Sequence, residues 1–221
     1  MGVTILFFSG LAVIAVWWLS TQRLTSKPWL EQGAAGEFPA TGVSSAPIAK
    51  VGLGVFLATI GSLFALFISA YFMRMQLADW RPVPKPALLW VNTGMLMLSS
   101  AALQWARAQA DRNKISGVRT ALLMAGGAAL VFVAGQLLAW RQLSAAGYFL
   151  TSNPASSFFY LITALHGVHV LGGLVALGRN VARAWQGRNL ARLSLGLDLC
   201  SLYWDFLLLM WLVLFGLLLL S

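Results

Sequence analysis

The sequence predicts an all-α protein, a polytopic bundle of about six transmembrane helices. Of its 221 residues, 59% are hydrophobic and only 10% are charged, whereas a soluble domain carries about 25% charged residues. The charged residues separate long apolar runs, and about 20 apolar residues suffice to cross the hydrocarbon core of a bilayer. A water-soluble fold is excluded, because so few charged residues cannot cover its surface.

The first predicted helix covers residues 2–20. It lacks the positively charged start of a signal peptide, and Arg23 and Lys27 follow it in place of a small-residue cleavage site. We therefore expect a retained helix. The segment after it is rich in Gly, Ala, Ser and Pro and has no apolar periodicity. The expected organisation is an N-terminal transmembrane helix in residues 1–30, a flexible link in 31–49, and a five-helix bundle in 50–221.

Five further apolar runs predict the helices of this bundle. Their approximate bounds are residues 51–73, 86–106, 120–140, 156–178 and 195–220. The stretch from Arg141 to Arg179 is too long for one crossing, and the segments 145–147 and 153–154 contain the Gly and Asn-Pro signals of a loop.

The basic residues predict the orientation, because Lys and Arg near helix ends are retained on the cytoplasmic side. The first, third and fifth links together carry eleven: Arg23, Lys27, Lys50, Arg107, Arg112, Lys114, Arg119, Arg179, Arg183, Arg188 and Arg192. The other side carries four: Arg74, Arg81, Lys85 and Arg141. Both termini should face away from the cytoplasm. We interpret the formal charge of +9 as this topology signal, and not as a site for nucleic acid or a specific lipid.

Ionisable residues inside the membrane are the first candidates for function. His166 and His169 lie one turn apart on the fifth apolar run, and Asp205 lies at a matching depth in the last. A protein zinc or copper site needs three or four ligands and a bis-histidine haem needs a partner on another helix, but the chain has two histidines and one cysteine, Cys200. We therefore expect no catalytic residue, metal or haem in this chain. We expect instead that the histidine pair, chiefly His169, holds Asp205 by a hydrogen bond.

Other polar residues in the apolar runs are expected to form hydrogen bonds between helices. They are Ser62, Asn92, Gln104 and Gln136.

Three motifs, in this order and spacing, carry a resemblance. They are Trp90-Val91-Asn92-Thr93 with Leu98-Ser99-Ser100 and Trp105-Ala106, then His166-Gly167 with His169-Val170, and finally Tyr203-Trp204 continuing through Phe206 to Trp211. From about Val51 to the C-terminus the sequence resembles the subunit III family of haem-copper terminal oxidases. Within these motifs the resemblance assigns packing roles to Asn92, Thr93, Trp204 and Trp211.

Two positions depart from the family pattern. Ser62 stands after Gly61, where the family usually has a glutamate in its second helix. Asp205 stands where the family has a histidine, and Leu208 where it has an aspartate, so the acid has moved by about one turn.

The resemblance implies a subunit without redox cofactors in a bacterial inner membrane. It implies that subunit I, which holds the haems and copper, and subunit II are its partners, and that bound phospholipid helps it support proton uptake by an oxygen-reducing, proton-translocating cytochrome c oxidase. The same fold in a quinol oxidase or a nitric oxide reductase is a close alternative. A small carrier with Asp205 as its coupling site and a membrane-bound haem electron carrier are alternatives of other classes.

Overall fold

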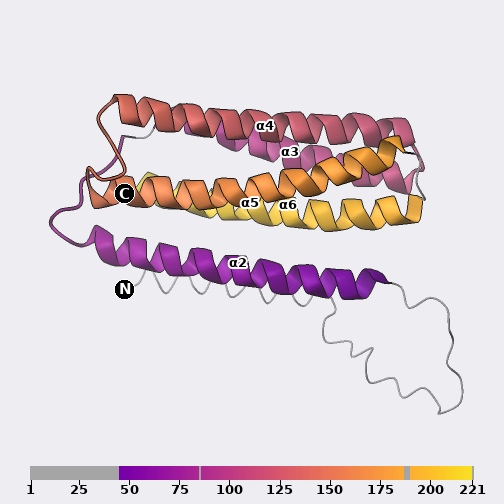
Figure 1. Ribbon diagram of the computed structural model, residues 1–221, viewed down its shortest axis with the longest axis horizontal. Coiled ribbons are helices and arrows are strands. Elements are labelled where there is room, and N and C mark those ends of the chain that lie inside the picture. The colour runs from indigo at the N-terminus through magenta and orange to yellow at the C-terminus, as the bar shows by residue number, and fades with distance from the viewer. Residues whose placement is uncertain (1–44, 85, 187–189, 221) are drawn as a thin grey trace, which may run out of the picture. The chain divides into compact units, whose positions relative to one another are not determined.

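A computed structural model describes residues 45–84, 86–186 and 190–220 (Figure 1). Its helices are α2 (Ser45–Met75), α3 (Leu88–Asp111), α4 (Ile115–Ala145), α5 (Pro154–Trp185) and α6 (Leu190–Leu220). The chain divides into two compact units, residues 1–52 and 53–221, and the second unit is described below. The predicted first helix and the link as far as residue 44 lie outside the described residues, so the division into three parts stays a prediction.

Four of these helices are long and apolar enough to cross a membrane. They are the segments Ile48–Met75, Ile115–Ala145, Pro154–Trp185 and Leu193–Leu220. At about 1.5 Å per residue, a 31-residue helix is about 46 Å long, which exceeds the hydrocarbon core of about 30 Å. The prediction of an all-helical membrane bundle is confirmed to this extent, while the six-helix count and the orientation of the termini stay predictions.

Helix α3 is the most polar of the five, and its polar residues explain why it is not among the four apolar spans. Several of them are buried against neighbouring helices: Asn92, Thr93, Ser99 and Ser100. A polar side chain in a membrane bundle is stable where it meets another helix. The low hydropathy of α3 thus reflects its role inside the bundle.

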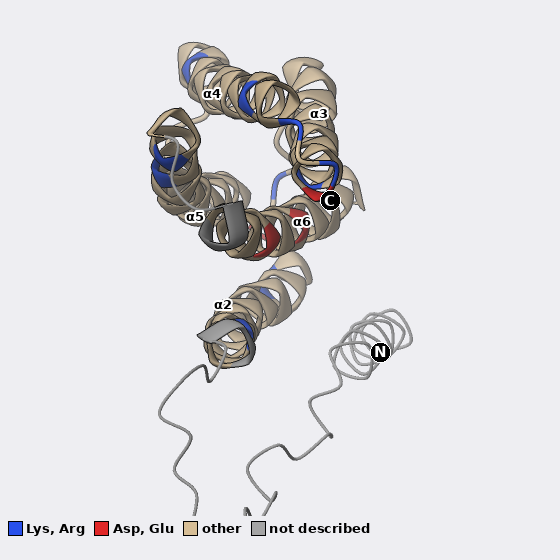
Figure 2. Ribbon diagram, turned by 90° about the vertical axis from the view of Figure 1, so that its right-hand side faces the viewer, with Lys and Arg blue, Asp and Glu red and all other residues tan. Residues whose placement is uncertain are grey.

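Helices α3, α4, α5 and α6 form an antiparallel ring (Figure 2). The direction follows from hydrogen bonds that join the start of one helix to the end of another. Arg119, near the start of α4, donates to the Ala184 carbonyl near the end of α5 at 3.0 Å, and Arg107, near the end of α3, donates to Asp198 near the start of α6 at 2.9 Å. Phe132 of α4 and Trp211 of α6 meet edge to face inside the ring, with centroids 5.0 Å apart. This arrangement is the up-and-down four-helix bundle.

From Leu53 onward, α2 packs on α5 and α6 through aromatic side chains. Phe64 is fully buried, and its ring lies 5.6 Å from His169, centroid to centroid. Tyr71 packs edge to face on Phe158 of α5, with centroids 5.5 Å apart. These contacts attach α2 to the outside of the ring.

The link between α4 and α5 turns at the two places that the sequence predicts. Gly147 has a φ of 86°, a conformation that glycine adopts at low cost. Asn153 caps α5, since its side-chain oxygen accepts a hydrogen bond from the Ser156 N–H at 3.0 Å, and Pro154 occupies the first helical position. The predicted loop before this helix is confirmed.

Candidate functional site: a polar seam between α3 and α6

Asp205 is bound by two side chains of α3. The Ser100 hydroxyl donates to Oδ1 and the Gln104 amide donates to Oδ2, each at 2.5 Å. Ser100 and Gln104 are four residues apart, so they lie on one face of their helix. Together they use both oxygens of a half-buried carboxylate.

The polar contacts continue along the same two helices. Arg107 donates from Nη1 to the Gln104 side-chain oxygen at 3.2 Å and from Nε to Asp198 Oδ1 at 2.9 Å. Asp198 lies two turns before Asp205 on α6. We call this row of five side chains, Ser100, Gln104, Arg107, Asp198 and Asp205, the polar seam.

The seam corrects the prediction that the histidines of α5 hold Asp205. The histidines and Asp205 lie at matching depths along their helices, but depth does not determine which neighbour a side chain faces. Successive residues of a helix are rotated by about 100° about its axis. Trp204 and Tyr203 occupy the face of α6 toward α5, as their close approach to Gly173 shows. The next residue, Asp205, is therefore turned to α3.

His166 lies in an aromatic enclosure within the bundle. Its side chain is fully buried, and its ring centroid lies 5.2 Å from that of Trp211, 5.9 Å from Phe132 and 6.4 Å from Phe64. Neither ring nitrogen has a hydrogen-bond partner within the described part of the chain. Such surroundings favour a neutral imidazole that acts as a packing group.

His169 is bound to its own helix. Its Nδ1 lies 2.7 Å from the Leu165 carbonyl oxygen, four residues earlier. The predicted grouping of His166, His169 and Asp205 is thus divided in the structure, because each of the three side chains has a different environment.

Asn92 joins α3 to α4. Its amide nitrogen donates to the Gln136 side-chain oxygen at 3.3 Å, and its side chain lies over Gly135, where a Cβ would come within 2.0 Å of the Asn92 oxygen. Because the glycine leaves room for the amide, this contact fixes the register of the two helices.

The other motif residues also join helices. Trp211 donates from its indole nitrogen to the Thr93 hydroxyl at 2.9 Å, and Thr93 in turn donates to the Leu89 carbonyl at 2.8 Å. Trp204 is fully buried and lies over Gly173 of α5. In both contacts a tryptophan of α6 lies against a small residue of a neighbouring helix, which leaves room for the indole ring.

Ser62 has no role between helices in the described structure. Its hydroxyl donates to the Ala58 carbonyl of the same helix at 2.9 Å, and the residue is exposed. The expectation of an interhelical hydrogen bond is wrong for Ser62, whereas it is confirmed for Asn92, Gln104 and Gln136.

Sequence reasoning missed Ser100, Arg107 and Asn180 as bonding residues. Asn180 donates to the Gly196 carbonyl of α6 at 3.1 Å, and Gly196 leaves space for it. For Asn180, the available signal was a polar residue just after one apolar run and a glycine near the start of the next. That signal needs the rotation of both helices, which the one-dimensional pattern lacks.

Among the described residues, no three His, Cys, Asp or Glu side chains form a group that could hold a metal ion. The thiol of Cys200 is buried and free.

Residues 48–220 match the protein family described as Cytochrome c oxidase subunit III. A Mycobacterium tuberculosis protein named probable cytochrome c oxidase subunit 3 is 31% identical over 171 residues, which cover 75% of this chain and 84% of that protein. The cytochrome c oxidase subunit 3 of Synechocystis is 30% identical over 170 residues, 74% of this chain and 72% of its own length. That of Thermostichus vulcanus is 30% identical over 173 residues, 76% of this chain and 85% of its own.

Proposed function

Because the chain belongs to the cytochrome c oxidase subunit III family, we propose that it is a non-catalytic membrane subunit of an oxygen-reducing, proton-translocating oxidase. In this role it binds the catalytic subunit I, which carries haems and copper, together with subunit II in a bacterial inner membrane. It stabilises the catalytic subunit and helps to sustain proton uptake, with bound phospholipid as part of that support. The observation that carries the proposal is the family match over residues 48–220.

The use of the polar residues supports an accessory role. The intramembrane carboxylate of Asp205 is bound by α3, and Asn92, Thr93 and Trp211 are bonded between helices. Hydrogen bonds of this kind hold the helices in fixed positions, so that the outside of the bundle is a rigid surface on which another subunit can pack.

Proton support in this protein is proposed to act through packing, surface charge and lipid. A serine stands at the position of the family's second-helix glutamate, and its hydroxyl is bonded within α2. The polar seam contains carboxylates, but they lie on α6 and are bound to α3. Restoring an acid by Ser62→Glu should therefore not be required for normal proton uptake.

The alternative of another class, a small carrier that couples transport to Asp205, is less well supported. A coupling carboxylate must exchange its partners during each cycle. Here both oxygens are engaged by two side chains of one neighbouring helix, an arrangement that favours a fixed structural role. The quinol oxidase and nitric oxide reductase alternatives differ in the partner subunits and keep the same role for this chain.

Purification through an affinity tag on the full chain tests the assembly. We expect subunits I and II to accompany it from native membranes in mild detergent, with a haem spectrum that changes on reduction. After dissociation, the separated chain should show no Soret band and no stoichiometric copper. Purification free of any haem protein, or haem retained by the separated chain, would contradict the proposal.

A further inference from the structure

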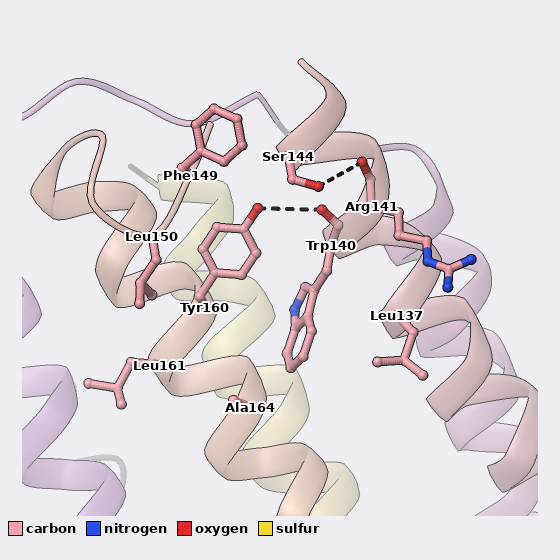
Figure 3. Close-up of a pocket in the computed structure, with 9 residues that line it drawn as sticks. All are labelled: Leu137, Trp140, Arg141, Ser144, Phe149, Leu150, Tyr160, Leu161 and Ala164. Carbon is pink, nitrogen blue, oxygen red and sulfur yellow. Dashed lines mark hydrogen bonds between the residues drawn. The ribbon is translucent and has the colours of Figure 1, made fainter. Parts of the chain in front are cut away.

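A pocket of about 640 Å³ lies between α4 and α5, near the link that joins them (Figure 3). Leu137, Trp140 and Arg141 line it from α4, and Tyr160, Leu161 and Ala164 line it from α5. Leu137 and Leu161 are about half exposed. The pocket is therefore an open, mostly apolar groove on the outside of two helices that are long and apolar enough to cross a membrane, with one cation beside it.

The aromatic wall of the pocket is held in place by hydrogen bonds. Tyr160 donates to the Tyr148 carbonyl of the link at 2.8 Å, and the Trp140 indole donates to the Thr163 hydroxyl at 3.1 Å. The two rings pack edge to face, with centroids 6.0 Å apart. The pocket is thus formed before any ligand enters, which lowers the entropic cost of binding.

The link presents two apolar side chains at the rim. Phe149 and Leu150 are more than half exposed, yet their backbone is held by hydroxyl groups. The Phe149 N–H donates to Ser152 Oγ at 2.8 Å, and Ser157 donates to the Leu150 carbonyl at 2.5 Å. A rigid loop with exposed apolar tips at the end of two membrane helices is suited to contact lipid.

Arg141 is the charged residue of this pocket, and its guanidinium has no hydrogen bond or ion pair with any described residue. Arg74, which the sequence places on the same side of the membrane, has a partner. It is paired with Asp79, and the hydrogen bond from Arg74 is the main reason that the pKa of Asp79 is held below its ordinary value. Arg141 also stands on the side where basic residues are few, so the positive-inside rule does not explain it.

We propose that this pocket binds one anionic phospholipid, whose phosphate pairs with Arg141 and whose acyl chain lies along Leu137, Leu161 and Ala164. A guanidinium pairs well with phosphate oxygens, and Trp140 and Tyr160 are the residue types that membrane proteins place at headgroup depth. A cation that has no counter-charge among the described residues favours a lipid of net negative charge over a zwitterionic one. For Arg141, a lipid-binding role therefore takes the place of the interpretation as a topology signal alone.

This lipid site rests on one part of the proposed function, the role of bound phospholipid, and on no other part of it. All the lining residues belong to α4, α5 and their link, so the site is defined within the described residues.

Native mass spectrometry of the full chain tests the site by counting bound lipids. The probes are phosphatidylglycerol and phosphatidylcholine with identical acyl chains, and inorganic phosphate as a competitor. We expect one tightly held phosphatidylglycerol that phosphate does not displace. Arg141→Gln should weaken its binding about five- to tenfold and leave phosphatidylcholine unchanged, while Arg141→Lys should restore most of the difference.

Two further variants test whether the lipid binds in this pocket and not elsewhere on the protein. Arg81→Gln removes an exposed cation outside this pocket and should not change binding. Ala164→Trp fills the apolar part of the groove and should weaken both lipids. Equal effects of Arg141→Gln and Arg81→Gln, no effect of Ala164→Trp, or displacement of the lipid by phosphate would overturn the proposal.

The lipid count does not depend on turnover, so the two proposals can fail separately. A chain that binds phosphatidylglycerol at Arg141 but does not prolong oxidase activity contradicts the proposed function alone. A chain that prolongs activity but binds no lipid here contradicts the site alone.

Discussion

At the scale of single residues, polar side chains inside the bundle have two kinds of environment, one with hydrogen-bond donors and one made of aromatic rings. Asp205 obtains two hydrogen-bond donors from α3, whereas His166 is fully buried among aromatic rings and its nitrogens are unbonded within the described residues. A carboxylate in an apolar medium requires donors, but a neutral imidazole can be enclosed at a lower cost. The sequence could show that both residues lie deep in the membrane, but not which neighbour each one faces.

The enclosure of His166 predicts that its shape matters more than its nitrogens. His166→Phe keeps an aromatic ring among Phe64, Phe132 and Trp211 and removes buried polar atoms, so it should cost less than about 1 kcal/mol. His166→Ala leaves a cavity and should cost about 2–4 kcal/mol. The free energy of unfolding in detergent measures both. A larger loss for the phenylalanine variant would show that the imidazole nitrogens are needed.

Asp205 should behave in the opposite manner, because its polar atoms matter. Asp205→Asn keeps an acceptor for Ser100, and the Gln104 amide can turn over to accept from the new NH2 group at the expense of the 3.2 Å hydrogen bond from Arg107, so the loss should be about 1 kcal/mol. Asp205→Ala removes both acceptors and should cost about 1–3 kcal/mol. Ser62→Ala is the matched control, because the Ser62 hydroxyl bonds only within its own helix. Equal losses for Asp205→Ala and Ser62→Ala would mean that the seam does not stabilise the bundle.

At the scale of helices, contacts between a glycine and a large side chain set how the helices meet. Gly173 lies under Trp204, and Gly135 lies under Asn92. The hydrophobic runs were sufficient to predict that each of these helices exists and roughly where it begins. They could not give the rotation of one helix against another, because several faces of an apolar membrane helix look alike in composition. For this reason the depth of Asp205 in the membrane could be predicted from the sequence, but the prediction that the histidines of α5 are its partners is wrong.

Gly173 provides a test of this packing. A Cβ there would come within 2.5 Å of the Trp204 ring and 2.9 Å of the Tyr203 ring, and rigid rings cannot move aside easily. Gly173→Ala should cost about 1–3 kcal/mol. Gly178→Ala in the same helix meets no atom within 4 Å and should be neutral or slightly stabilising. The comparison is made by denaturant titration in detergent, and two equal losses would contradict the packing of α5 on α6.

At the scale of the whole molecule, the antiparallel ring agrees with the alternation of basic and less basic links. The α3–α4 link, the end of α5 and the start of α6 lie at one end of the ring, and the links α2–α3 and α4–α5 lie at the other, since successive helices run in opposite directions (Figure 1). The richer set of Lys and Arg belongs to the first of these ends. The side of the membrane on which each end lies remains a prediction from the positive-inside rule.

Reporter fusions test this orientation. A fusion after Ser221 should be active only with a reporter that works outside the cytoplasm, because eleven basic residues on alternate links outweigh four. A fusion within the α3–α4 link, next to Lys114, should give the opposite result. A cytoplasmic signal from Ser221 together with an external signal from the link would reverse the topology.

The central claim is that this chain supports an oxidase whose chemistry lies in other subunits. The most direct measurement is oxygen consumption by the complex purified with and without the chain, followed over many turnovers and across a range of pH. We expect equal initial rates and a faster loss of activity without the chain, most marked at high pH, where proton uptake is hardest to sustain. Complete loss of the initial rate in a correctly assembled catalytic subunit would contradict the accessory role, and identical time courses would contradict the supporting one.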